Sequence, residues 1–173
     1  MHEVGFSILP IRCRLSDLAA IAQPADEATS VLAVEQAFTL AVTVEFLGAG
    51  AIALLRLQPQ ICVEFYAKPA IAGETLGLGL VREGAIASTS IYRLEHLIES
   101  PRAAGLAPGT VYHIGALLRV GALEGPALIA GVHEALMVEM YALESVAPKG
   151  AEAMSTDDLQ DKARNNKKRV LQT

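Results

Sequence analysis

The sequence contains no tryptophan, and phenylalanine and tyrosine together supply only 5% of its 173 residues. Its core must therefore be filled with Val, Leu, Ile and Ala, and the apolar fraction of 52% is large enough to build one. Charged residues make up 19% of the chain, so the composition is globular and excludes wholesale disorder. The length suits one domain with tails, because domains commonly contain about 100–150 residues.

Positive charge and long apolar runs are also scarce. The formal net charge is −5, and the one basic cluster is Lys167–Arg169. Nucleic acids and anionic membranes attract basic surfaces, so we expect neither as a partner. The longest apolar stretch, residues 38–57, is interrupted by Glu45 and Arg56. Because a membrane-spanning helix needs about 20 apolar residues, we expect no membrane span.

The features of a secretory signal are missing from the beginning of the sequence. Glu3 precedes any basic residue, and Arg12 and Arg14 interrupt the apolar segment that a signal would need. We therefore expect a cytoplasmic location. Only two cysteines are present, Cys13 and Cys62, and neither belongs to a CxxC pair. In a reducing compartment free thiols are favoured over a disulfide bridge between them, which is the alternative.

Apolar and polar residues alternate with a period of two over much of the chain, which is typical of strands with one buried face. We predict strands over residues 38–46, 51–57, 60–68, 76–80, 111–120 and 128–141. Short strands at this spacing, separated by Gly and Pro, indicate an all-β sandwich or barrel. The absence of long helices between the strands disfavours a doubly wound α/β fold.

Two segments depart from the strand pattern. Ser16 and Asp17 are suitable caps for a short helix through Leu18–Ile21, because their side-chain oxygens accept hydrogen bonds from free backbone N–H groups. Leu94–Ala104 has helical spacing that is cut short by Pro101, which predicts one or two helical turns.

We divide the chain into three parts. Residues 1–30 form a strand and helix segment that packs on the domain, with a short strand at Val4–Leu9. Residues 31–147 form the sandwich. Residues 148–173 are a polar tail that we expect to be mostly disordered, and the alternative is a helix that docks on a partner.

The most specific local pattern, Leu-x-Pro-Gly-Thr-x-Tyr-x-Ile, begins at Leu106 and lies within the segment ending at Ala116. Pro108 and Gly109 suit a tight turn between two sheets, and the side chain of Leu106 would fill the end of the core. The ring of Tyr112 would pack inward, where its hydroxyl needs a hydrogen-bonding partner. This run resembles the tyrosine corner of immunoglobulin-like and fibronectin type III sandwiches. The alternative is an ordinary Pro-Gly turn before a strand.

The resemblance implies an immunoglobulin-like antiparallel β-sandwich, with residues 111–120 as the penultimate strand and residues 128–141 as the last. The missing tryptophan and the connection at 94–104 fit a divergent, early-set sandwich better than a true fibronectin module. With its short N-terminal and inter-strand helical turns, the expected fold class remains all-β.

Histidine supplies the best candidate for a metal site. If residues whose numbers sum to about 246 face each other in the last hairpin, His113 and His133 are neighbours with Glu134 close by. Two imidazoles and a carboxylate can bind zinc, but a slip of one residue separates the rings. We expect no cofactor. Since no motif places a base beside a nucleophile, we also expect no enzyme.

The last strand supplies the best candidate for an interaction site. Met137, Met140 and Tyr141 lie in an apolar stretch that few polar residues interrupt, which indicates an edge covered by a protein partner or a second copy. The alternative is that Val4–Leu9 of the same chain covers this edge. We therefore expect a non-catalytic protein-interaction or assembly module. The second hypothesis is a small-ligand or carbohydrate-binding sandwich, which the absence of Trp disfavours.

Overall fold

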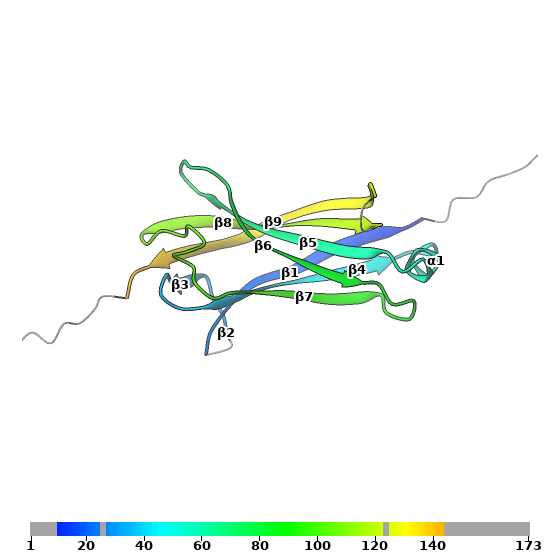
Figure 1. Cartoon of the computed structure of the whole chain (residues 1–173), viewed down its shortest axis with the longest axis horizontal. Coiled ribbons are helices and arrows are strands. Elements are labelled where there is room, and N and C mark those ends of the chain that lie inside the picture. Colours follow the sequence, from blue (N-terminus) through cyan, green and yellow to red (C-terminus); the bar gives the residue numbers. More distant parts are fainter. Residues whose placement is uncertain (1–9, 25–26, 123–124, 144–173) are drawn as a thin grey trace, which may run out of the picture. The chain divides into compact units, whose positions relative to one another are not determined.

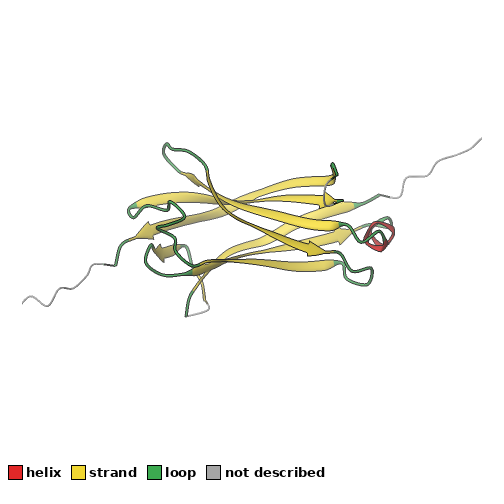
Figure 2. Ribbon diagram, viewed as in Figure 1, coloured by secondary structure: helices red, strands yellow, loops and turns green. Residues whose placement is uncertain are grey.

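The computed structural model describes residues 10–24, 27–122 and 125–143, which form two stacked β-sheets (Figure 1). The first sheet has the order β2-β1-β4-β7, with bounds β1 (Arg12–Ala22), β2 (Glu27–Ala28), β4 (Phe38–Leu47) and β7 (Ile91–Ile98). The second has the order β3-β9-β8-β5-β6, with bounds β3 (Val31–Ala33), β5 (Gln60–Pro69), β6 (Leu76–Gly84), β8 (Thr110–Gly121) and β9 (Ala127–Tyr141). A short helix, α1 (Ala51–Arg56), lies at one end of the sandwich (Figure 2).

The strand order is that of an immunoglobulin-like sandwich. In chain order, β1, β4 and β7 take the positions of strands A, B and E, and β5, β8 and β9 take those of C, F and G. The strand β6 joins β5 in the second sheet, at the position of strand C′. All neighbouring strands are antiparallel except β3 and β9, which run parallel. The predicted antiparallel sandwich is confirmed.

The core lies between the two sheets and follows the alternation of the central strands. Each of these strands directs every second side chain inward, because successive Cβ atoms point to opposite faces. The buried inward side chains are Phe38, Leu40, Val42, Val44 and Phe46 of β4, Ile61, Val63, Phe65 and Ala67 of β5, and Tyr112, Ile114, Ala116, Leu118 and Val120 of β8. Phe65 is the central buried ring on β5, in a chain that has no tryptophan.

The helix predicted over Leu18–Ile21 is wrong, because this segment belongs to strand β1. The strand pairs with β4 from Arg12 onward. The register shifts between Ser16 and Ala19, and Asp17 there has a φ of 54°. The polar pair that suggested a helix cap therefore marks a β-bulge, where one strand carries extra residues and bends. Strand pairing in the sandwich thus begins well before residue 31.

The opposite error concerns residues 51–57, where a strand was predicted and α1 forms. Leu54 and Leu55 of this helix are buried, whereas Ile52 is exposed. An apolar run of this length cannot be assigned by periodicity alone, since both faces of a strand and one face of a helix satisfy it.

The helical turns predicted over Leu94–Ala104 form only in part. Leu94–Ile98 continues strand β7, and the turn follows it. There the Ala104 N–H donates to the Ser100 carbonyl at 3.0 Å, which is the spacing of one helical turn.

Three parts of the predictions lie outside the described residues: the strand at Val4–Leu9, residues 144–147 of the sandwich, and the tail at 148–173. Within the part of the chain that the structure describes, no helix is long and apolar enough to cross a bilayer.

Candidate functional site

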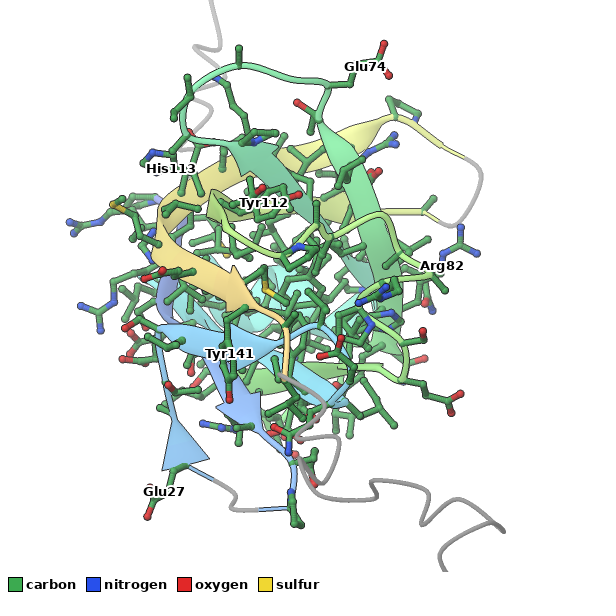
Figure 3. All side chains as sticks on the ribbon, turned by 90° about the vertical axis from the view of Figure 1, so that its left-hand side faces the viewer. Glu27, Glu74, Arg82, Tyr112, His113 and Tyr141 are labelled. Atoms are coloured by element: carbon green, nitrogen blue, oxygen red, sulfur yellow. The ribbon has the colours of Figure 1, made fainter. Side chains whose placement is uncertain are left out.

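The turn into β8 holds the side chains of the predicted tyrosine corner. Tyr112 is buried near the start of β8, and its hydroxyl accepts a hydrogen bond from the Ala107 N–H at 3.0 Å. Leu106 is also buried. Gly109 has a φ of 73°, a left-handed conformation that favours glycine, and its N–H donates to the Met140 carbonyl at 2.7 Å. Pro108 lies exposed between Leu106 and Gly109. Figure 3 shows Tyr112 directed into the molecule.

A second buried tyrosine, Tyr92, binds the loop that precedes β7. Its hydroxyl accepts from the Ile86 N–H at 2.8 Å and lies 2.8 Å from the Thr89 carbonyl, which accepts its proton. Its ring meets Phe46 edge to face, with centroids 5.9 Å apart. Its inward position beside Phe46 assigns it to the core.

The predicted pairing of His113 with His133 is wrong. His113 lies opposite Met137, and a register shift after Ile114 places His133 opposite Ala116. The two imidazoles therefore belong to different rows of the hairpin. Figure 3 shows His113 at the surface. Among the described residues, no group of three or more His, Cys, Asp or Glu side chains is placed to hold a metal ion.

Glu134, the third member of the predicted metal set, lies instead beside Tyr66 on the outer face of the second sheet. The ring of Tyr66 covers Gly115, where a Cβ would collide with it. This burial raises the pKa of Tyr66, and the negative charge of Glu134 raises it further.

The predicted interaction residues of β9 separate into three environments. Met140 is only 1% exposed and belongs to the core, so its assignment to an interaction edge is wrong. Tyr141 is partly exposed, but β3 pairs with this end of β9 and covers its edge. Met137 is 52% exposed and lies beyond the reach of β3.

Most of β9 has an unpaired edge. The strand β3 pairs only with Glu139–Tyr141, so no described strand pairs with the outer side of Ala127–Val138. We call this segment the free edge of β9. It contains no Lys, Arg or Pro, its one charged residue is the exposed Glu134, and its large exposed apolar side chains are Leu128, Val132 and Met137.

The outer face of the second sheet carries a shallow pocket of about 140 Å³. In the middle of the pocket, Cys62 of β5 lies opposite Arg82 of β6 on one side and opposite Arg119 of β8 on the other. We call these residues the Arg82–Cys62–Arg119 row. Other lining side chains include Gln60, Glu64, Leu80 and Leu117.

The two arginines of this row have no ionic partner within the described residues. The ion pairs found there are Arg14–Glu45, Arg93–Glu95 and Arg102–Glu35. Both thiols are free: Cys62 lies in the pocket, and Cys13 lies half-buried in β1. Burial raises the pKa of Cys13 to about 11.

No protein-family model and no curated protein matches the sequence. A solved β-glucosidase from Listeria innocua is 12% identical with a TM-score of 0.42; the match covers 81% of this chain and only 17% of that one. The CARDB domain of a Pyrococcus furiosus protein, solved with di-metal ions, is 13% identical over 81% of this chain and 100% of that one, with a TM-score of 0.38. An immunoglobulin-like protein from Pseudomonas aeruginosa is 7% identical over 72% and 95%, with a TM-score of 0.33.

The chain is an immunoglobulin-like β-sandwich. With similarities this low, the fold class rests on the strand order and pairing of the chain itself. The sequence predicted an interaction edge on the last strand that includes Met137, but it did not predict which part of this edge is unpaired, and it did not predict the Arg82–Cys62–Arg119 row. Both depend on which strands pair and in what register.

Proposed function

We propose that the chain is a non-catalytic assembly module in which two copies associate through the free edge of β9. The observation that carries this proposal is the unpaired outer side of Ala127–Val138. Backbone N–H and C=O groups along such an edge can pair with a strand of another chain. A second copy of β9 would extend the five-stranded sheet across the contact.

The chemistry of this edge supports pairing. Soluble proteins protect free edges with charged side chains, Pro or short strands. The edge strands on the other side of the sandwich have such protection, with Arg82 and Glu83 on β6 and Arg93 and Glu95 on β7. The free edge of β9 has a single charged residue, Glu134, and exposes Leu128, Val132 and Met137, whose burial in a contact would be favourable.

The distribution of charge favours a second copy as the occupant. Figure 1 shows β1 and β9 beginning at the same end of the sandwich, and Leu15 Cδ1 lies 3.4 Å from the position of a Cβ on Gly131. Exposed Arg12 therefore lies near the beginning of β9, whereas Glu139 lies near its end. Two antiparallel copies related by a two-fold axis bring the basic end of each beside the acidic end of the other.

The oligomeric state of the full chain tests this proposal. We expect light scattering after size exclusion to show a dimer whose fraction rises with protein concentration. Val132→Lys should give a monomer, because it places two ammonium groups in the contact. Val132 is 62% exposed, so the variant should keep the far-ultraviolet spectrum and the thermal midpoint of a folded monomer.

The matched control is Leu80→Lys on the opposite edge strand β6, where the side chain is also exposed. It should leave the dimer intact. A chain that stays monomeric at every concentration would overturn the proposal. If the monomer also shows slow amide exchange along 127–138, the edge is covered within the chain, as residues 4–9 would do.

A further inference from the structure

The Arg82–Cys62–Arg119 row places a small thiol between two long cationic side chains. Directly opposite residues of an antiparallel sheet have Cβ atoms about 5 Å apart, so the side chain of each arginine begins next to that of Cys62. Since neighbouring strands are about 4.8 Å apart, the arginine backbones are roughly 10 Å apart across β5. Cys62 thus lies between Arg82 and Arg119 in one row across the sheet, and all three residues line the pocket.

The charges of the pocket are not balanced by the described residues. Arg82 and Arg119 make no ion pair there, and Glu64 is the one described carboxylate in the lining. Among the described lining residues, two guanidiniums and one carboxylate leave one positive charge. Figure 3 shows Arg82 reaching away from β6 at the surface, where a ligand can approach it.

We infer that this pocket binds the carboxylate group of a small organic acid, with Arg82 and Arg119 as its binding residues. A guanidinium presents parallel N–H donors that match the two oxygens of a carboxylate. One carboxylate neutralises the remaining positive charge, whereas a doubly charged phosphate would bring excess negative charge beside Glu64. Leu80 and Leu117 provide apolar walls for the rest of the ligand.

The volume of the pocket limits the size of the ligand. About 140 Å³ is close to the volume of a cavity that holds one benzene ring, about 150 Å³. An acid of a few heavy atoms fits within the pocket, and a larger one would extend over the outer face of the sheet. The site lies on this face and is independent of self-association through the free edge of β9.

Cys62 makes the inference testable because it reports directly on the pocket. Iodoacetate and iodoacetamide alkylate a thiolate in the same way: an S–C bond forms, the C–I bond breaks and iodide leaves. The two reagents have nearly the same shape, but only iodoacetate carries a carboxylate. Mass spectrometry of the full-length protein after digestion separates the peptide of Cys62 from that of Cys13. Near neutral pH, Cys13 should react slowly with either reagent, because its pKa is raised to about 11.

The quantity to measure is the ratio of the two alkylation rates at Cys62. We expect the ratio of iodoacetate to iodoacetamide to be about fivefold higher in the wild type than in Arg82→Gln/Arg119→Gln, the effect of two exposed charge pairs. High salt should reduce the difference, since it screens exposed charges. Arg93→Gln removes an exposed arginine from the other sheet and should leave the ratio unchanged.

A competition experiment separates binding from alkylation. Benzoate should slow the reaction of Cys62 with iodoacetamide, and neutral benzamide of the same shape should not. An equal rate ratio in the wild type and in the double arginine variant would overturn the inference. Stronger protection by inorganic phosphate than by benzoate would also overturn it, because the site would then prefer a tetrahedral dianion.

Discussion

The hydroxyl of Tyr112 accepts a hydrogen bond from the backbone N–H of Ala107 at 3.0 Å, across the turn that leads into β8. The bond spans five residues and joins the beginning of a central strand to the loop before it. Leu106, next to Ala107, is buried at this end of the core. The tyrosine therefore fixes the direction in which the chain enters the second sheet.

Tyr112→Phe should lower the free energy of unfolding by about 1–2 kcal/mol, because it leaves the Ala107 N–H without its partner and keeps the packing of the ring. Chemical denaturation measures the change. Tyr141→Phe is the matched control, since the structure shows no hydrogen bond from the partly exposed Tyr141 hydroxyl to the described residues. Equal losses in the two variants would contradict a structural role for the hydroxyl of Tyr112.

Tyr92→Phe should have a similar cost, about 1–3 kcal/mol, because the Tyr92 hydroxyl both accepts from Ile86 and donates to the loop. Amide exchange should become faster in the loop at 86–89. The two tyrosines lie at the beginnings of β7 and β8, at opposite ends of the sandwich in Figure 1. The double variant should therefore lose the sum of the two single losses to within about 0.5 kcal/mol. A clearly smaller loss would show that the two ends are coupled.

The sequence predicts local features of this fold well. The turn at Pro108 and Gly109 and the inward position of Tyr112 depend on residues that are close in the chain, so their pattern can be read directly. The same holds for the alternation in β4 and β5, where burial on one face requires every second residue to be apolar.

Features that depend on pairing between distant segments could not be predicted. His113 and His133 were expected to meet, but a register shift after Ile114 separates them. Arg82 lies opposite Cys62 because β6 pairs with β5 in one particular register. A short polar pair such as Ser16-Asp17 serves either a helix cap or a β-bulge, and the pairing of β1 with β4 decides between them.

Gly79→Ala should destabilise the sandwich by about 1–3 kcal/mol because of backbone strain alone, since Gly79 has a φ of 145°. A Cβ there would also collide with the ring of His96, which stacks on Phe65 with centroids 6.4 Å apart. Thermal and chemical denaturation measure the loss. The control, Gly77→Ala on the same strand, meets no atom within 4 Å and should cost little.

The collision and the strain can be separated with His96→Ala. In that background Gly79→Ala should cost less than it does in the wild type, because the ring is gone while the strain remains. An unchanged loss of stability would show that the ring of His96 moves away from the added Cβ without a measurable penalty. Packing between β7 and β6 would then not hold the ring in place.

The Glu35 carboxylate joins three segments and should make stability depend on pH. It accepts from the Leu143 N–H at 3.1 Å and from Arg102 Nη2 at 2.7 Å. The Leu143 hydrogen bond and the Arg102 charge lower the pKa of Glu35 in the folded chain. A lowered pKa stabilises the fold above the pKa of the unfolded chain, about 4.3 for Glu, and this contribution is lost as the pH falls through the folded pKa.

Glu35→Gln should therefore lower the denaturation midpoint at neutral pH, and the gap to the wild type should close on acidification below about pH 4. Denaturant titrations at a series of pH values measure this gap. Glu74→Gln, in the loop between β5 and β6, makes the same change of net charge away from Arg102 and Leu143 and should show no comparable gap. If the difference in midpoint between Glu35→Gln and the wild type stays constant across the pH range, the variant acts through packing. The ionised carboxylate would then contribute nothing to stability.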